Sequence, residues 1–129
     1  MGIDRIIVRR MNGAIRTGLL LIMGGTATPV MAHHSFAMFD LDKSITLIGT
    51  VREFQFTNPH CFIQLMVPQG DANAEWSIEM AAPAHLVRSG WTRSTVKPGE
   101  KITLIIHPMR AGGLGGSYVS GTHQDGTPL

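Results

Sequence analysis

Residues 44–80 decide the fold: SITLIGTVREFQFTNPHCFIQLMVPQGDANAEWSIEM. Apolar and polar side chains alternate along three parts of this stretch, as on strands with one buried face. These parts are 44–57, 60–67 and 74–80. Asn58-Pro59 and the turn-rich segment 68–73 interrupt the alternation. Three strands in immediate succession predict an antiparallel meander.

The same alternation predicts which side chains face the core. The expected inward residues are Ile45, Leu47, Gly49 and Val51, then Cys61, Ile63, Leu65 and Val67, then Trp76, Ile78 and Met80. Gly49, in the middle of the first strand, predicts a bend or bulge. Glu75 and Glu79 fall on the opposite face of their strand, which predicts solvated carboxylates.

The periodicity changes after this meander. Segment 83–89 predicts a short helix, because a proline opens it and a glycine follows it. Further strands are expected at 101–109 and 117–123, with a glycine-rich hairpin at 111–116 between them. That run has neither the following helix nor the Lys-Ser/Thr pair of a phosphate-binding loop.

The predicted fold class is all-β with one short helix, namely a five-stranded OB-like antiparallel barrel over residues 44–129. Its evidence is the order of elements: three strands, a helix, then two strands. A small β-sandwich is the alternative, although sandwiches usually have more than five strands. Residues 33–43 would form an N-terminal arm.

Residues 1–32 have the three parts of a signal peptide. A basic region carries four arginines, the apolar run 19–23 follows, and the small-residue tail 26–32 ends in Ala32. Cleavage after Ala32 would send the protein to the periplasm, in contact with the membrane only during export. An uncleaved anchor is the alternative, but the apolar run falls short of the roughly 20 residues needed to span a bilayer.

The export route follows from the same segment. Arg9-Arg10 is compatible with the twin-arginine pathway, but its flanking residues fit that signal poorly, so general secretion is favoured. Without residues 1–32, seven Lys and Arg stand against eight Asp and Glu, a net charge of −1. The basicity of the whole chain therefore belongs to the signal, and nucleic acid is not an expected partner.

Cys61 is the single cysteine, so no disulfide within the chain can stabilise the domain. A buried thiol is the favoured interpretation, and a reactive thiol the alternative. No enzyme activity is expected. Cys61 and His60 are neighbours on a strand and point to opposite faces, so they cannot form a nucleophile–base pair. The serines lack the Gly-x-Ser-x-Gly pattern.

Several short motifs are spread over the chain: His33-His34-Ser35-Phe36, Gly49-Thr50-Val51, Asn58-Pro59-His60, Glu75-Trp76-Ser77, Gly90-Trp91-Thr92, Lys97-Pro98-Gly99 and the glycine-rich run 112–116. With these motifs the chain resembles a family of secreted proteobacterial proteins of unknown function. The resemblance covers essentially all of the chain after the signal. It implies a compact β-domain outside the cytoplasm and supplies no activity.

A chain that begins at His33 offers metal ligands at its amino terminus. Its α-amine and imidazole can bind one divalent ion, and further imidazoles from His34 and the His60 turn would complete a nitrogen set suited to copper(II). The alternatives are a flexible soluble leader for the histidine pair and a turn residue for His60. No HxxxH, HExxH or CxxC spacing supports the metal site.

Weaker metal candidates lie elsewhere. His107 and His123, near the ends of the last two strands, are expected to converge if they bind metal, whereas structural or solvated roles are the alternative. His85, in the helix segment, is expected to be a surface residue. Three methionines offer soft ligands for copper(I) or else fill the core: Met38, Met66 and Met109.

The second class of function is a module that binds a periplasmic protein or small ligand without metal. OB-type barrels commonly bind on one sheet face and its loops. The candidates for that face are Arg52, Phe54, Phe56, Phe62, Gln64 and Trp91. For the aromatic residues the alternative is core packing.

Overall fold

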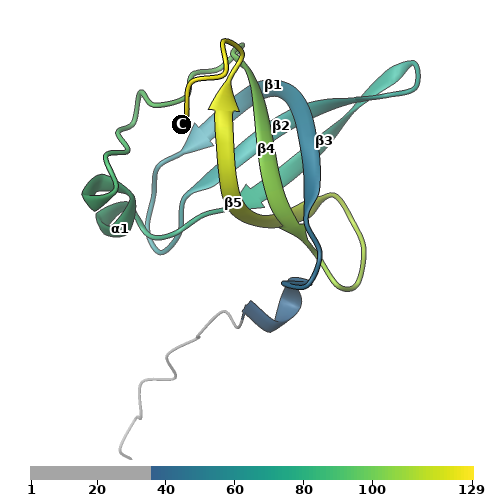
Figure 1. Cartoon of the computed structure of the whole chain (residues 1–129), viewed down its shortest axis with the longest axis horizontal. Coiled ribbons are helices and arrows are strands. Elements are labelled where there is room, and N and C mark those ends of the chain that lie inside the picture. Colours follow the sequence, from purple (N-terminus) through teal and green to yellow (C-terminus); the bar gives the residue numbers. More distant parts are fainter. Residues whose placement is uncertain (1–35) are drawn as a thin grey trace, which may run out of the picture. The chain divides into compact units, whose positions relative to one another are not determined.

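The structure is a computed structural model, and it describes residues 36–129. The expected signal segment and the His33-His34 pair lie outside the described residues. A short 3-10 helix, η1, opens the described chain, and five strands with one α-helix follow (Figure 1). Their bounds are η1 Phe36–Met38, β1 Ile45–Gln55, β2 Phe62–Gln69, β3 Ala72–Glu79, α1 Pro83–Arg88, β4 Lys101–Pro108 and β5 Gly115–His123.

The strands form a closed barrel in the order β1-β2-β3-β5-β4, which confirms the predicted fold class. Four neighbouring pairs are antiparallel, and β3 pairs with β5 in parallel. A ring with an odd number of strands cannot alternate direction throughout, so closure of five strands requires a parallel pair. The purely antiparallel barrel expected from the sequence is therefore wrong at this one pairing.

The barrel interior is filled by the side chains that the alternation places inward. Ile63, Leu65, Ile78, Leu104 and Ile106 are each 0% exposed. They belong to one continuous cluster. Helix α1 contributes Leu86 to this cluster, and the segment after α1 contributes Trp91. Removing such apolar surface from water contributes about 25 cal/mol per Å² buried. The barrel is therefore held together by packing, without a disulfide among the described residues.

Strand β1 departs from the expected alternation at its far end. A β-bulge lies between Val51 and Glu53, and Gly49 is not its centre. A bulge adds one residue and shifts every later side chain to the other face. Phe56, expected on the exposed side, is consequently buried, and Phe54 packs against the core cluster.

The loops are shorter than the sequence indicated. Strands β2 and β3 continue to the pair Gln69–Ala72, so a two-residue turn replaces the expected loop 68–73. Gly70, with φ of 61°, supplies the positive φ that such a hairpin needs. Strand β5 begins at Gly115, within the run expected to be a flexible hairpin.

Gly49 is required by close approach of strand β2. A Cβ atom at Gly49 would lie 2.6 Å from the carbonyl oxygen of Met66 and 2.8 Å from Cγ of Leu65. The first neighbour is backbone in a paired strand and cannot move alone.

We expect Gly49→Ala to lower the free energy of unfolding by about 1–3 kcal/mol, the usual cost of overpacking a core. Urea denaturation measures this loss. Thr46→Ala, an exposed position on the same strand, is the control and should change stability by no more than about 0.5 kcal/mol. Equal stabilities of the two variants would contradict the close approach.

Cys61 is fully buried in the core, as the sequence favoured, and burial raises the pKa of its thiol. The folded protein therefore holds the thiol proton more tightly than the unfolded chain. Since stability falls with pH where the native state binds more protons, this contribution is complete below the ordinary thiol pKa of about 8.5 and declines above it.

We expect the free energy of unfolding to fall between pH 8 and 9.5, and the fall to be smaller in Cys61→Ala. Urea denaturation at a series of pH values gives the slope of the free energy of unfolding against pH for each protein. Because these slopes are compared, and not the stabilities themselves, the cavity left by alanine does not affect the comparison. Rapid reaction of the native thiol with a disulfide reagent at pH 8 would show instead that Cys61 is accessible.

Candidate functional site

A pocket of about 210 Å³ lies where the N-terminal arm meets one end of the barrel. The arm, residues 36–43, and strands β3 and β5 supply most of its walls, and α1 supplies one side chain. Its lining residues are Phe36, Phe39, His60, Glu79, Met80, Ala81, Leu86, Ser117 and Tyr118. The walls are mainly apolar, with imidazole, carboxylate and phenol groups among them.

The polar centre of this pocket is a hydrogen bond between His60 and Glu79. Nδ1 of His60 contacts Oε1 of Glu79, whose side chain is only 17% exposed. The expectation that Glu79 lies on a solvated face is therefore wrong. Its strand ends beneath the arm, and the residues that cover it come from distant parts of the chain.

Backbone hydrogen bonds hold His60 in place beyond the ends of β2 and β3. The amide of Met80 donates to the carbonyl of Cys61 at 2.9 Å, and the amide of Cys61 donates to the carbonyl of Ala81 at 3.2 Å. These bonds continue the β2–β3 ladder, so the His60 side chain starts from a fixed backbone position next to Glu79.

The arm is attached to the end of β4 and to the β4–β5 loop. Phe39 is 4% exposed and forms an isolated β-bridge with Met109. The amide of Asp40 donates to Pro108 at 2.8 Å, and the amide of Arg110 donates to Met38 at 2.9 Å. Figure 1 shows η1 beside the β4–β5 loop at this end of the barrel.

An ion pair strengthens the same attachment. The carboxylate of Asp40 lies 3.2 Å from Nζ of Lys43 and 3.7 Å from a guanidinium nitrogen of Arg110. The hydrogen bond from Lys43 and the nearby positive charges lower the pKa of Asp40. The arm is thus fixed at Phe39–Asp40, and Phe36 lies at the rim of the pocket, 66% exposed.

Tyr118 forms the wall opposite the arm. Its ring meets Trp91 edge-on, with centroids 5.5 Å apart, and burial raises the pKa of its phenol. Sequence analysis singled out neither Tyr118 nor Glu79 as a site residue. The register of the parallel β3–β5 pair, which sets Glu79 opposite Ser117, is the signal that brings them together, and it is a long-range property.

His85, His107 and His123 do not line this pocket. In the β4–β5 pairing, His107 stands opposite Ser117 and His123 stands opposite Ile102, at the other end of the pair. The two residues do not converge, contrary to expectation, because antiparallel strands place the end of one beside the start of the next. Nδ1 of His107 lies 2.6 Å from the carbonyl of Lys43, and His123 pairs with Glu100. His85 is exposed on α1, as expected.

Most aromatic residues expected on the binding face pack into the core instead. Trp91 and Phe56 are buried, and Phe54 packs tilted against Trp91 with centroids 5.8 Å apart. Phe62 is half-buried at the start of β2 and lines a second pocket beside the arm.

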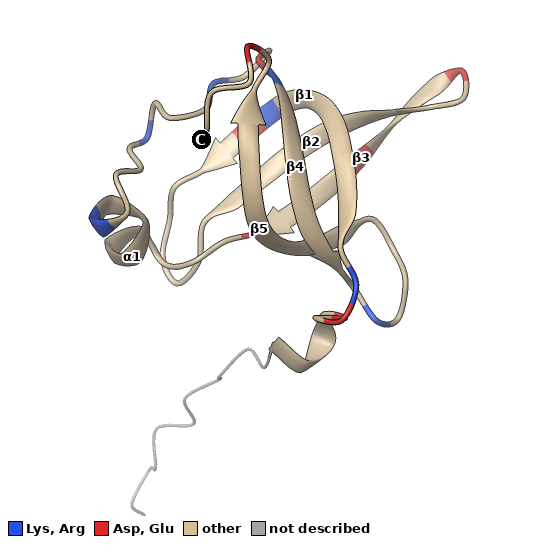
Figure 2. Cartoon of the chain, in the orientation of Figure 1, with Lys and Arg blue, Asp and Glu red and all other residues tan. Residues whose placement is uncertain are grey.

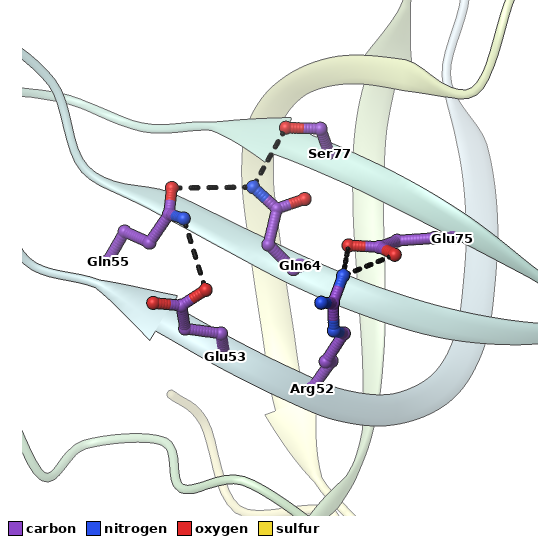
Figure 3. A network of polar contacts seen from close by, with 6 residues as sticks. All are labelled: Arg52, Glu53, Gln55, Gln64, Glu75 and Ser77. Carbon is purple, nitrogen blue, oxygen red and sulfur yellow. Dashed lines mark hydrogen bonds and ion pairs between the residues drawn. The ribbon is translucent and has the colours of Figure 1, made fainter.

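The polar side chains of that face pair with one another (Figure 3). Arg52 pairs with Glu75, while Gln64 donates to Ser77 at 3.2 Å and to Gln55 at 3.4 Å. This face of β1, β2 and β3 is therefore a satisfied polar surface. Elsewhere on the barrel, Lys, Arg, Asp and Glu lie mainly at turns and strand ends (Figure 2).

A complete metal site is absent from the described part of the chain. Within residues 36–129, no three side chains of His, Cys, Asp or Glu gather closely enough to hold a metal ion. His60 and Glu79 provide one imidazole and one carboxylate, so a metal bound here needs further ligands. His33 and His34, which directly precede the described arm, are the candidates for these ligands.

The chain belongs to DUF6152, a family of unknown function, whose sequence model matches residues 21–118. The match includes the arm, the whole of β1 to β4, and His60, Glu79 and Tyr118. No curated protein matches the chain. Across residues 36–129, no helix has the length and apolar character needed to cross a membrane.

Tyr118 is the single tyrosine of the chain, so its ionisation can be followed directly by tyrosinate absorbance. We expect the titration midpoint of the folded protein to lie above the ordinary value of about 10, because burial disfavours the phenolate. The same protein in urea should titrate near 10. Tryptophan fluorescence shows whether the chain is still folded at each pH. Identical midpoints would mean that the pocket is open to water.

Proposed function

We propose that this protein is exported to the periplasm and binds copper(II) through the amino terminus exposed by cleavage after Ala32. The ligands are the α-amine and imidazole of His33, with His60 of the barrel and His34 as further nitrogens. One observation carries the proposal: Phe36, three residues after His33, lines the same pocket as His60. The composition of residues 1–32 supports the periplasmic address.

Chain length permits this site. One residue spans at most about 3.6 Å, so the three residues from His33 to Phe36 reach at most about 11 Å. Phe36 and His60 face a pocket of about 210 Å³, whose dimensions are well inside that reach. The arm is fixed at Phe39 and Asp40, so the first described residue, Phe36, is held beside the pocket of His60.

The surroundings of His60 support a ligand role over a turn role. Metal-binding imidazoles usually direct one ring nitrogen at a carboxylate, which fixes the orientation of the ring and raises its basicity. Glu79 has this relation to His60 through Nδ1. The sequence alone gave His60 no such partner.

Copper(II) is the ion that this ligand set favours. It binds imidazole well, prefers tetragonal nitrogen and oxygen ligands, and forms the most stable complexes of the divalent first-row metals. The free α-amine titrates at about 7.7–8.0 and imidazole near 6.5, and both must lose their protons to bind. Affinity should therefore be higher at pH 8 than at pH 6.

A site for an organic ligand or partner protein is the second candidate. The pocket is mainly apolar, which suits an organic ligand, but its volume of about 210 Å³ is below the 300–1,000 Å³ of typical small-molecule sites. A metal ion with a coordinated water fits this space better. Dependence on the free amino terminus separates the candidates, because only the metal site uses the α-amine.

The test is native mass spectrometry and copper(II) titration of the protein recovered from the periplasm. We expect a chain that begins at His33 and retains one copper ion. His60→Ala should weaken binding at least tenfold, and Glu79→Gln should weaken it by about 10–100-fold, the usual effect of losing a partner of a metal-binding histidine. Acetylating the α-amine of His33 should abolish tight binding, because the α-nitrogen becomes an amide and no new amine replaces it.

His85→Ala is the matched control, since it removes an exposed imidazole on α1 and should leave copper affinity unchanged. Thermal unfolding of each variant shows that the barrel is intact. A mature chain that starts elsewhere, or copper affinity that does not depend on His33 and His60, would refute the proposal. Unchanged binding after this acetylation would refute the role of the α-amine.

A further inference from the structure

A second pocket, of about 240 Å³, adjoins the first along the arm and brings two methionines together. Met38 comes from η1 and Met109 follows β4, so the two are distant in sequence. The pocket shares Phe39 and Glu79 with the first one. Both methionines are described residues, so their placement does not depend on the amino terminus.

Backbone contacts fix the two methionines relative to each other. Phe39 forms a β-bridge with Met109, and the amide of Arg110 donates to the carbonyl of Met38 at 2.9 Å. The amide of Met109 in turn donates to Gly115 at 3.2 Å. A Cβ on Gly115 would stand 2.9 Å from Sδ of Met109, so the thioether occupies space that only glycine leaves open.

Core filling explains Met38 poorly. A methionine that fills a gap in a core is buried, as Met80 is at 5% exposed, whereas Met38 is 40% exposed. Met66, the third methionine considered for copper(I), lines a different pocket with Ile48 and Pro68. Met38 and half-buried Met109 thus share one pocket, apart from the buried Met80 and the distant Met66.

We propose that Met38 and Met109 form a thioether site for a soft monovalent cation, copper(I) in the cell. Thioethers are soft, polarisable ligands that select copper(I) over harder ions. The glycine-rich loop 111–116 closes the site from the far side, with the exposed side chain of Leu114 on its wall. The bound ion enters already reduced, so the site requires no electron transfer.

This site goes beyond the proposed copper(II) site and does not rest on it. Copper(II) needs the deprotonated amine and imidazole nitrogens, whereas the thioethers carry no proton and bind at any pH. The two sites share Glu79 and Phe39 in their walls but no ligand. The protein would therefore hold either oxidation state of copper at the same end of the barrel.

The test uses Ag(I), a redox-inert probe for copper(I), and the purified protein labelled with ¹³C at its methionine methyl groups. We expect the resonances of Met38 and Met109 to shift together and to stop shifting at one equivalent of Ag(I). Met66 and Met80 should not shift. Reading individual methyl groups keeps this site distinct from any silver bound by the thiol of Cys61.

The variants Met38→Leu and Met109→Leu keep an apolar side chain of similar volume and remove one thioether each. Either variant should weaken Ag(I) binding at the remaining methionine at least tenfold with little change in thermal stability, and Met66→Leu, the control, should not alter it. Acetylation of the His33 α-amine should leave Ag(I) binding intact, so failure of the copper(II) site is distinguishable from failure of the thioether site. Independent shifts of Met38 and Met109, or none at all, would overturn the proposal, and an absence of shifts would leave the surface as an apolar contact only.

Discussion

One parallel strand pair closes the barrel and thereby sets the rest of the structure. It joins Ser77–Glu79 of β3 to Gly115–Ser117 of β5. It closes a ring of five strands, and closure leaves no sheet edge unpaired. The approach is close on both sides of β5: a Cβ on Gly116 would lie 2.6 Å from the carbonyl oxygen of His107. Two consecutive glycines make this closure sterically possible.

Closure also builds the candidate site. It carries the end of β3, with Glu79, to the start of β5, with Ser117 and Tyr118. The end of β4 and the β4–β5 loop receive the arm, which covers the same end of the barrel. Glu79 therefore contacts His60 and lines both the pocket of His60 and the pocket of Met38 and Met109.

Local patterns predict the features of this protein that depend on neighbours along the chain. Alternation identified the core of β1, β2 and β3, and the proline and glycine around residues 83–90 identified α1. The bulge between Val51 and Glu53 has no local signal, and it reversed the expected faces of Phe54 and Phe56. The flexible hairpin expected at 111–116 became partly strand, because a glycine that permits close approach resembles a loop glycine in sequence.

In the candidate site, too, local features were predictable from the sequence and long-range ones were not. His60 was identified from its chemistry, whereas its partner Glu79 was assigned to solvent because its strand alternates with core residues. The covering groups come from an arm about 40 residues earlier and a strand about 40 residues later, so no local rule could place them. The expected convergence of His107 and His123 failed for the same reason, since it depended on strand direction.

The central claim is that the arm delivers the amino terminus to the pocket that holds His60. The most direct measurement is the loss of backbone amide signals in ¹H–¹⁵N spectra of the protein beginning at His33, as copper(II) is added below one equivalent. Paramagnetic broadening is confined to the surroundings of the ion. The account predicts that signals of Ala81, Ser117 and Tyr118 disappear first, while those near His123, at the opposite end of the β4–β5 pair, persist. Broadening centred on His123 or His85, with the pocket signals intact, would contradict it.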